Sequence, residues 1–261
     1  MALKALLIDI DGTLLFRGEA IAGANRALQE AAEAGLAVRL LTNISAKLPH
    51  HIAAGLQACG IDVAEDSIQT AGMACSAYIR RQPDTSCHLL VPDAMAALFE
   101  DMRRDDRRPD FVVIGDVAER FDYDLLNGIF RMLRDGAQLV VPHRNLYWFD
   151  GAGPPRLDAG AFILGLEAAA GQAAIVTGKP SAVFFQAALD ALGVSAGEAL
   201  VVGDDLLTDI AGARASGLAS VLVRTGKGET PRAPDAAAPD TELQSIAGLM
   251  PYLHGAGLLA R

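Results

Sequence analysis

Short apolar stretches alternate with amphipathic stretches that end at a glycine, and this alternation is the feature that most restricts the fold of the chain. Residues Leu3–Ile10 are mostly apolar, which is typical of a strand buried on both faces. Residues 24–34 then carry apolar side chains at helical spacing, and Gly35 stands where a helix C-cap belongs. A strand at Val38–Leu41 and a helix ending at Gly60 continue the order, which predicts parallel strands with helices on both faces.

The last third of the chain repeats this order. We predict, in sequence, a helix at Pro180–Leu192, a strand in ALVVGDD at 199–205, a helix at Thr208–Ser216 and a strand in ASVLVRTG at 219–226. Three more strand candidates occupy the middle of the chain: CHLLVPD at 87–93, FVVIGD at 111–116 and AQLVVPH at 137–143. Helical segments separate them, so the middle is expected to form an α/β unit of its own.

The length of 261 residues is long for one compact domain and fits two unequal ones. We therefore predict an α/β fold class with a Rossmann-like, doubly wound parallel-sheet core domain made of residues 1–74 and 165–261. Residues 75–164 are predicted to form an inserted α/β cap domain.

Composition argues against several classes of function. The net charge of −10, from 22 basic and 32 acidic residues, disfavours a nucleic-acid or anionic-membrane partner. No stretch approaches the ~20 apolar residues that a membrane span needs, and Asp9 comes before any long apolar core of a signal peptide. Three cysteines without CxxC spacing are typical of reduced thiols, so we expect a cytoplasmic protein.

Polar residues interrupt the apolar pattern where the predicted core strands end, which is where ligands bind in open parallel sheets. They are Asp9, Asp11, Thr42, Asn43, Lys179, Asp204, Asp205 and Asp209. Each one alone is explained by a turn, a helix cap or a surface charge. Together they form a set of converging carboxylates that needs a hard cation, and Mg²⁺ prefers such oxygen ligands.

Asp9 and Asp11 are two residues apart, so on a strand their side chains point to the same side. Two like charges this close raise each other's pKa unless a cation neutralises them. One such carboxylate beside Mg²⁺ can attack phosphorus and form an aspartyl-phosphate, while its neighbour protonates the leaving oxygen and then activates water. Lys179 and the Thr42 hydroxyl would hold the phosphoryl group.

Four motifs occur in a fixed order: DIDGT at 9–13, LTN at 41–43, GKPS at 178–181 and VGDDLLTD at 202–209. In this order they resemble the haloacid dehalogenase-like hydrolases over nearly the whole chain. The long insertion between the second and third motifs resembles the C2-type cap of the NagD-like branch, subfamily IIA. The stretches GKPSAVFF, GDDLLTDIAGA and VRTGK look closest to the subgroup of phospholysine phosphohistidine inorganic pyrophosphate phosphatase.

The resemblance implies a role for each motif residue. Asp9 matches the nucleophile and a Mg²⁺ ligand, and Asp11 matches the general acid/base that also offers its backbone carbonyl to the metal. Thr42 and the Asn43 backbone match the phosphate-binding motif, and Lys179 matches the lysine that steadies nucleophile and phosphate. Among the later acids, Asp204 matches a metal ligand, whereas Asp205 and Asp209 match carboxylates that orient metal-bound water.

We therefore expect a Mg²⁺-dependent phosphatase that hydrolyses a small phosphorylated compound through an aspartyl-phosphate. Human-type members of the similar subgroup carry Ser where this chain has Asp11, and an acid there favours ordinary phosphate esters. The alternatives are a phosphohistidine, phospholysine or pyrophosphate phosphatase, a phosphomutase, and a non-catalytic regulator that binds Mg²⁺ and phosphate. The resemblance also implies a homodimer.

Substrate choice is expected from the cap, where VPHRNLYWFDG at 141–151 follows a strand. His143, Arg144, Tyr147 and Trp148 would form an aromatic and cationic lip that holds a ring or a second anion. The alternative is a cap strand that packs Tyr147 and Trp148 on its own helices.

Overall fold

The computed structural model describes residues 3–149, 154–229 and 237–259, and they form two compact units. The first unit contains the residues up to Thr42, Pro49–Gln69 and the residues from Lys179 onward. The second unit contains Asn43–Leu48 and Thr70–Gly178. Each unit is built on its own sheet, and we describe each by itself.

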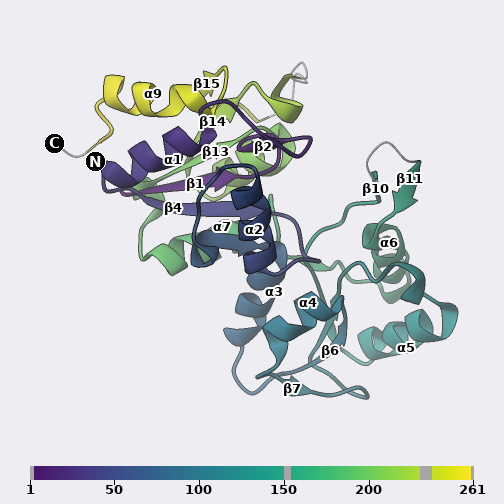
Figure 1. Ribbon diagram of the computed structural model, residues 1–261. Coiled ribbons are helices and arrows are strands. Elements are labelled where there is room, and N and C mark those ends of the chain that lie inside the picture. The colour runs from purple at the N-terminus through teal and green to yellow at the C-terminus, as the bar shows by residue number, and fades with distance from the viewer. Residues whose placement is uncertain (1–2, 150–153, 230–236, 260–261) are drawn as a thin grey trace. The chain divides into compact units, whose positions relative to one another are not determined.

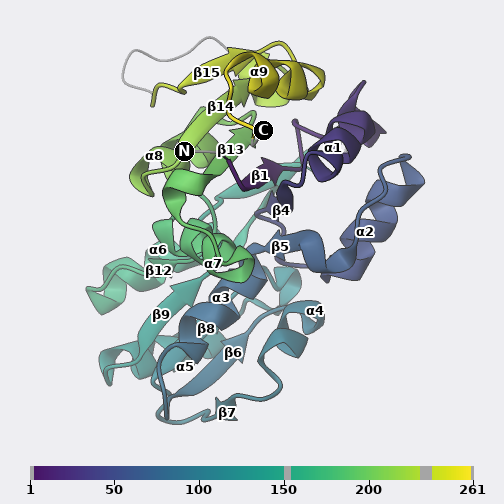
Figure 2. The same ribbon diagram turned by 90° about the vertical axis from the view of Figure 1, so that its left-hand side faces the viewer.

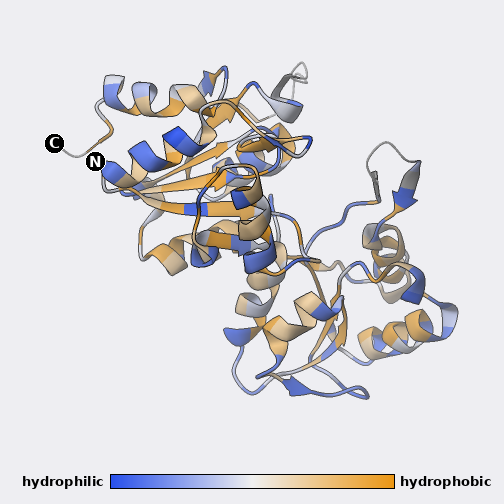
Figure 3. Ribbon diagram, viewed as in Figure 1, coloured by the Kyte–Doolittle hydropathy of each residue, from blue (hydrophilic) through white to orange (hydrophobic). Residues whose placement is uncertain are grey.

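The sheet of the first unit has six strands in the order β15-β14-β13-β1-β4-β5. Their bounds are β1 Ala5–Asp9, β4 Ala37–Thr42, β5 Ile68–Thr70, β13 Ala199–Gly203, β14 Ala219–Val223 and β15 Thr241–Leu243. Strand β1 pairs in parallel with β4 on one side and β13 on the other, and all five of its residues are buried. The apolar run that predicts a central strand is visible along β1 and β13 (Figure 3).

Chain order changes direction at β1, because β4 and β5 extend the sheet on one side and β13 to β15 on the other. The carboxyl ends of β1 and β13 are therefore neighbours at a topological switch point, where open α/β sheets bind ligands. This relation brings Asp9, the last residue of β1, next to the acidic segment that follows β13.

Helices cover both faces of this sheet. Their bounds are α1 Ala24–Glu33, α2 Pro49–Ala58, α7 Ala182–Leu192, α8 Ala211–Ala215 and α9 Leu249–Gly255. Helices α1 and α9 pack together over one face, and α7 lies over the other (Figure 1). Helix α2 begins at Pro49, a residue that is tolerated in the first turn of a helix. A small hairpin of β2 Leu15–Phe16 and β3 Glu19–Ala20 follows β1.

The segment after β13 differs from the helix predicted at Thr208–Ser216. Its first turn, Leu206–Ile210, is π-helical, and α8 is correspondingly short. Two backbone N–H groups, those of Asp209 and Ile210, donate to the Asp205 carbonyl at 2.9 and 3.2 Å. Single π-helical turns are frequent at functional sites, and this one orients the Asp209 side chain back toward the strand end.

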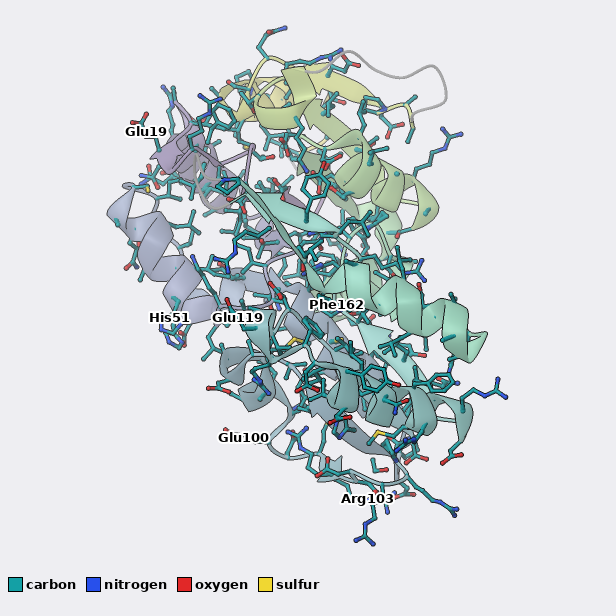
Figure 4. The ribbon with its side chains drawn as sticks, turned by 90° about the vertical axis from the view of Figure 1, so that its right-hand side faces the viewer. Glu19, His51, Glu100, Arg103, Glu119 and Phe162 are labelled. Atoms are coloured by element: carbon teal, nitrogen blue, oxygen red, sulfur yellow. The ribbon has the colours of Figure 1, made fainter. Side chains whose placement is uncertain are left out.

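The sheet of the second unit has five parallel strands in the order β12-β9-β8-β6-β7 (Figure 2). The bounds are β6 Ser86–Leu90, β7 Arg103–Arg104, β8 Phe111–Ile114, β9 Gln138–Val141 and β12 Ile175–Val176. Strand β7 is one of the two edge strands, and its Arg103 side chain projects outward from the sheet (Figure 4).

Helices cover both faces of the second sheet as well. They are α3 Ala71–Arg80, α4 Asp93–Ala96, α5 Tyr123–Arg134 and α6 Ala159–Ala170. Alternate residues of β8 show the two faces: Val112 and Ile114 pack in one core with α5 and α6, and Phe111 and Val113 in another with α3 and α4. A hairpin of β10 Tyr147–Phe149 and β11 Pro155–Leu157 precedes α6. Phe162 of α6 stacks on Phe121 with ring centroids 4.2 Å apart (Figure 4).

The predicted α/β class with parallel sheets is confirmed, but the units divide at other residues than the predicted domains. The expected boundary at residue 165 falls inside α6, whose Ile163 and Leu166 both belong to the core beneath α5. Strand β12 pairs with β9, so residues 165–178 belong to the second unit. Residues 43–48 and 70–74 also belong to the second unit.

Two remaining expectations concern membranes and cysteines. Within residues 3–149, 154–229 and 237–259, no helix combines the length and the apolar character needed to cross a bilayer. Cys75 and Cys87 are buried and Cys59 is half-buried, and all three are free thiols. Burial raises the pKa of the Cys75 thiol to about 12, so this residue is a small buried hydrophobe.

Candidate active site

Asp9 is the last residue of β1, and its carboxylate is buried with 6% of the residue exposed. Thr13 donates from its hydroxyl to Asp9 Oδ2 at 3.2 Å, and the Lys179 ammonium contacts Asp9 Oδ1. A tight turn follows the strand, because the N–H groups of Leu14 and Leu15 both donate to the Ile10 carbonyl. The turn brings the Thr13 hydroxyl back to the carboxylate of Asp9, the candidate nucleophile.

Gly12 in this turn allows the close approach of β1 to the end of β13. Its φ of +96° lies in the region that favours glycine, and a Cβ there would overlap with the Asp204 carboxylate. Gly203 has the same function on the other strand, where a Cβ would overlap with the Asp209 carboxylate. Two glycines thus leave the space that the acidic side chains occupy.

Asp9, Asp204 and Asp209 each offer a carboxylate oxygen, and these oxygens all lie within 4.8 Å of one another. All three residues are buried. Asp209 Oδ2 accepts the backbone N–H of Asp205 at 3.1 Å, which fixes the orientation of its carboxylate. The cluster thus joins Asp9 of the first acidic motif to Asp204 and Asp209 of the last one, whereas the expected metal ligands were Asp9, Asp11 and Asp204.

Lys179 supplies the buried positive charge in the cluster. Its ammonium donates to Asp209 Oδ1 at 2.7 Å and also contacts Asp9, and only 5% of the residue is exposed. Burial opposes the charge, but the carboxylates of Asp209 and Asp9 outweigh this effect and raise the pKa of Lys179 above its ordinary value. Lys179 is therefore a permanent cation.

One lysine does not neutralise three carboxylates. Burial raises the pKa of Asp9 well above its ordinary value, with Lys179 acting in the opposite direction and Asp209 adding to the rise. The pKa of Asp204 is raised to about 6, first by burial and then by the charges of Asp209 and Asp205, against a backbone hydrogen bond from Lys227. The protein alone leaves a surplus of negative charge here, which a bound cation would relieve.

Two further motif residues of the first unit, Thr42 and Asp11, differ in burial. Thr42 is buried at the end of β4, next to β1 in the sheet, whose Asp9 is in register with Leu41. Asp11 is exposed, and its side chain is not part of the carboxylate cluster found among the described residues. The resemblance assigns only its backbone carbonyl to the metal, so this assignment stays a prediction.

Asn43 begins the short segment that groups with the second unit. Its amide oxygen lies against Gly178, where a Cβ would be 2.7 Å away. Gly178 directly precedes Lys179, so the second and third motifs meet at this pair. The predicted role of the Asn43 backbone in phosphate binding stays a prediction.

A loop that we did not predict as part of the site completes it. Thr225 donates from its hydroxyl to the Gly12 carbonyl at 2.6 Å, and the Lys227 N–H donates to Asp204 Oδ2 at 2.7 Å. The Lys227 ammonium pairs with Asp205 Oδ2 at 2.6 Å. The stretch VRTGK places polar residues directly after a buried strand, which is the pattern that marks the other site residues. In the sequence analysis this stretch served only as part of the family resemblance.

The four cap residues that were predicted to form a lip differ in burial and in contacts. His143 is buried with 8% exposed, and its Nδ1 lies 4.0 Å from Asp158 Oδ2 without a hydrogen-bond partner among the described residues. Arg144 pairs with Glu167 of α6, which explains it as a structural contact. Tyr147 is 58% exposed, whereas the side chain of Trp148 lies outside the described residues. The predicted lip is not tested by these contacts.

Comparison with known proteins agrees with the motifs. The family model described as haloacid dehalogenase-like hydrolase matches residues 6–103, and a HAD-hydrolase-like model matches residues 176–249. The human haloacid dehalogenase-like hydrolase domain-containing protein 2 is 36% identical over 226 residues, which are 87% of this chain and 86% of that protein. The phospholysine phosphohistidine inorganic pyrophosphate phosphatase of Xenopus laevis is 36% identical over 231 residues, covering 86% of this chain and 84% of that protein.

Solved structures share the fold over almost the whole chain. NagD from E. coli K-12 has a TM-score of 0.85 at 26% identity, with 95% of this chain and 98% of that chain covered. A p-nitrophenyl phosphatase from Archaeoglobus fulgidus has a TM-score of 0.84 at 23% identity, with 97% and 100% covered, and this similarity concerns the fold alone.

The chain belongs to the haloacid dehalogenase-like hydrolases, in the NagD-like branch. It is accordingly an enzyme, a hydrolase, and the predicted family is confirmed.

Proposed function

We propose that this protein is a Mg²⁺-dependent phosphatase that works through an aspartyl-phosphate formed on Asp9. The observation that carries the proposal is the buried carboxylate of Asp9 at the end of β1, in contact with Lys179 and within 4.8 Å of Asp204 and Asp209. A buried carboxylate with a fixed lysine is placed for nucleophilic attack, provided that a cation neutralises its neighbours.

The donor set fits Mg²⁺. Lys179 offers one positive charge to the three clustered carboxylates of Asp9, Asp204 and Asp209, while Lys227 pairs with Asp205. The surplus equals the charge of one divalent cation, and all ligand atoms are the oxygens that Mg²⁺ prefers. We assign the metal to Asp9, Asp204 and the Asp11 backbone carbonyl, with Asp209 and Asp205 orienting its water. Bound there, Mg²⁺ would polarise the phosphoryl oxygens and neutralise their charge.

The protein residues have separate roles in the proposed reaction. One Asp9 oxygen attacks phosphorus as the bond to the leaving oxygen breaks, and Asp11 gives that oxygen a proton. In the second step Asp11 takes a proton from water, which attacks phosphorus and releases Asp9 and inorganic phosphate. Asp11 suits this exchange because it is exposed, whereas Asp9 is buried. Thr42, the Asn43 backbone and Lys179 would hold the phosphoryl oxygens.

We propose a small phosphate ester as the substrate, because Asp11 provides the proton that an alkoxide leaving group needs. A phosphoramidate or pyrophosphate is the second candidate, favoured by the similarity to the Xenopus laevis phospholysine phosphohistidine inorganic pyrophosphate phosphatase. The predicted homodimer and cytoplasmic location remain predictions, and light scattering of the purified protein tests the first.

The test is release of inorganic phosphate from a panel, with Mg²⁺ and with EDTA. The panel contains para-nitrophenyl phosphate, sugar phosphates, phosphoglycolate, pyridoxal phosphate, pyrophosphate and phosphohistidine. We expect Mg²⁺-dependent turnover that Asp9→Asn abolishes, and the exposed Asp66→Asn of the same unit serves as the matched control. Asp11→Asn should lose ester hydrolysis more than pyrophosphate or phosphohistidine hydrolysis. Folded protein that binds Mg²⁺ but releases phosphate from no substrate would favour the regulator alternative.

A further inference from the structure

Two adjacent acids, Asp204 and Asp205, follow β13, and the loop Arg224–Gly228 after β14 holds each of them in a different way. The backbone N–H of Lys227 donates to Asp204 Oδ2 at 2.7 Å. The side chain of the same residue reaches the other acid, with its ammonium 2.6 Å from Asp205 Oδ2. One residue thus sets the orientation of both carboxylates.

The loop itself is firmly held. Arg224 donates its backbone N–H to the Leu243 carbonyl at 2.8 Å and its guanidinium to the Gly228 carbonyl at 3.0 Å. Gly226 has a φ of +54°, and a Cβ there would overlap with Asp204 and with the Gly12 backbone. The loop is therefore in close contact with the Asp204 carboxylate, and its own hydrogen bonds fix its position.

The contacts distinguish the two acids chemically. Both oxygens of Asp205 are engaged, because Oδ1 accepts the Leu207 N–H at 2.8 Å and Oδ2 pairs with the Lys227 ammonium. Asp204, by contrast, lies with Asp9 and Asp209 in the carboxylate cluster, and Asp205 is absent from that cluster among the described residues. An adjacent carboxylate without such a partner would compete for the same cation.

We propose that Lys227 is a positioning residue of this site: its ammonium holds Asp205 away from the carboxylate cluster while its N–H orients Asp204, so that Asp204 alone of the two is presented to the cation. This inference rests on the proposed function. It explains why a lysine that is 75% exposed on its side chain is paired with an acid that is 11% exposed. The lysine end of the pair is open to solvent and the carboxylate end is buried, so the contact fixes the orientation of the Asp205 carboxylate.

The first test compares Lys227→Met with Lys4→Met. Lys4 is the matched control, since it pairs with Glu198 at 2.6 Å in the same unit, is 62% exposed, and precedes β1 at its amino end, away from the site. In Lys227→Met we expect kcat at saturating Mg²⁺ to fall about 10-fold, the size typical of residues that orient a ligand. Mg²⁺ affinity, measured by calorimetry, should be unchanged or tighter, because Asp205 becomes an additional ligand. Lys227→Arg should keep most of the native kcat.

The second test adds Asp205→Asn, which keeps the oxygen that accepts the Leu207 N–H. Removing the competing carboxylate should restore kcat in the double variant to the value of Asp205→Asn alone. A residue that only supports the fold would not show this restoration. Melting temperatures of Lys227→Met and Lys4→Met should agree within about 2 °C, because each variant loses a pair between an exposed lysine and a mostly buried acid.

The results separate this inference from the proposed function. If native protein hydrolyses phosphate compounds with Mg²⁺ and Lys227→Met behaves like Lys4→Met, the positioning role is wrong and the proposed function stands. A loss in Lys227→Met that persists on the Asp205→Asn background also overturns the role. Native protein that neither binds Mg²⁺ in the calorimeter nor releases phosphate overturns both.

Discussion

The Lys179 ammonium donates to Asp209 Oδ1 at 2.7 Å and also contacts Asp9, so one buried cation joins the end of β1 to the π-helical turn after β13. These two acids are 200 residues apart in the chain, and each is less than a tenth exposed. Two buried carboxylates this close would repel each other without the lysine. The two ion pairs therefore stabilise the close approach of these acids.

Lys179→Met should destabilise the protein and abolish turnover together. Removing the cation leaves two buried carboxylates unpaired, a change that typically costs about 3–5 kcal/mol of unfolding free energy. Urea unfolding in EDTA measures this loss, and Lys4→Met is the control for removing an ion pair at the surface. We expect Mg²⁺ to restore part of the stability, since it neutralises the same carboxylates. Equal stability of Lys179→Met and native protein in EDTA would contradict the prediction.

Most of the site was predictable because apolar strands mark where a parallel sheet ends. Asp9, Thr42 and Asp204 each follow a run of buried residues, and parallel strands bring such positions to one edge. Lys179 lies outside a strand, yet its motif preceded a recognisable helix, α7, and the resemblance assigned its role. Periodicity and family motifs together were sufficient to predict where these residues lie, and their roles in the reaction stay predictions.

The rest depended on tertiary contacts that no local pattern records. The closeness of Asp209 to Asp9 follows from a π-helical turn, which has no simple periodicity and was predicted as ordinary helix. Lys227 reaches Asp205 only because β14 lies beside β13, and a lone lysine after a strand is usually a surface charge. Strand β12 has two residues and is recognised only by its pairing with β9, so the domain boundary predicted at 165 differed from the division in the structure.

Gly12→Ala should reduce activity far more than Gly35→Ala. Both glycines have positive φ, +96° and +76°, so alanine at either position costs roughly 1 kcal/mol of backbone strain. A Cβ at position 12 would also overlap with Asp204, whereas no atom lies within 4 Å of one at position 35. We expect Mg²⁺ affinity and phosphate release to fall at least 10-fold in Gly12→Ala only. Similar kinetics for the two variants would refute the steric argument.

Mg²⁺ should stabilise the native protein against unfolding and have little effect on Asp204→Asn. A ligand that binds only the folded state adds about 2.7 kcal/mol at 100 times its Kd. Thermal unfolding at increasing Mg²⁺ measures this gain, with EDTA as the zero point and Ca²⁺ as a comparison of ion size. Because Asp204 is a member of the carboxylate cluster, its amide variant loses a charged ligand. A shift of the same size in both proteins would place the ion elsewhere.

The stability of the second unit should depend on pH through His143. Burial lowers the pKa of His143, although the carboxylates of Asp158, at the start of α6, and Asp116, after β8, act in the opposite direction. The unfolded chain then takes up a proton below about pH 6.5 at a position where the folded protein does not. Because the unfolded state binds more protons, the free energy of unfolding should be highest above about pH 6.5. It should decrease as the pH falls toward about 5.

Asp158 changes the free energy of unfolding with pH in the opposite direction from His143. Burial raises the pKa of Asp158, so the folded protein takes up that proton more readily than the unfolded chain. Its contribution is present below the ordinary carboxyl pKa of about 3.9 and is lost as the pH rises through the raised value, so the clearest window for His143 lies between about pH 5 and 7. Urea unfolding of native protein, His143→Gln and the exposed α2 control His51→Gln across this window tests the assignment. The decrease should vanish in His143→Gln and persist in His51→Gln. If His143→Gln follows the native profile, the histidine does not carry the pH dependence, and its buried Nδ1 acts only in packing.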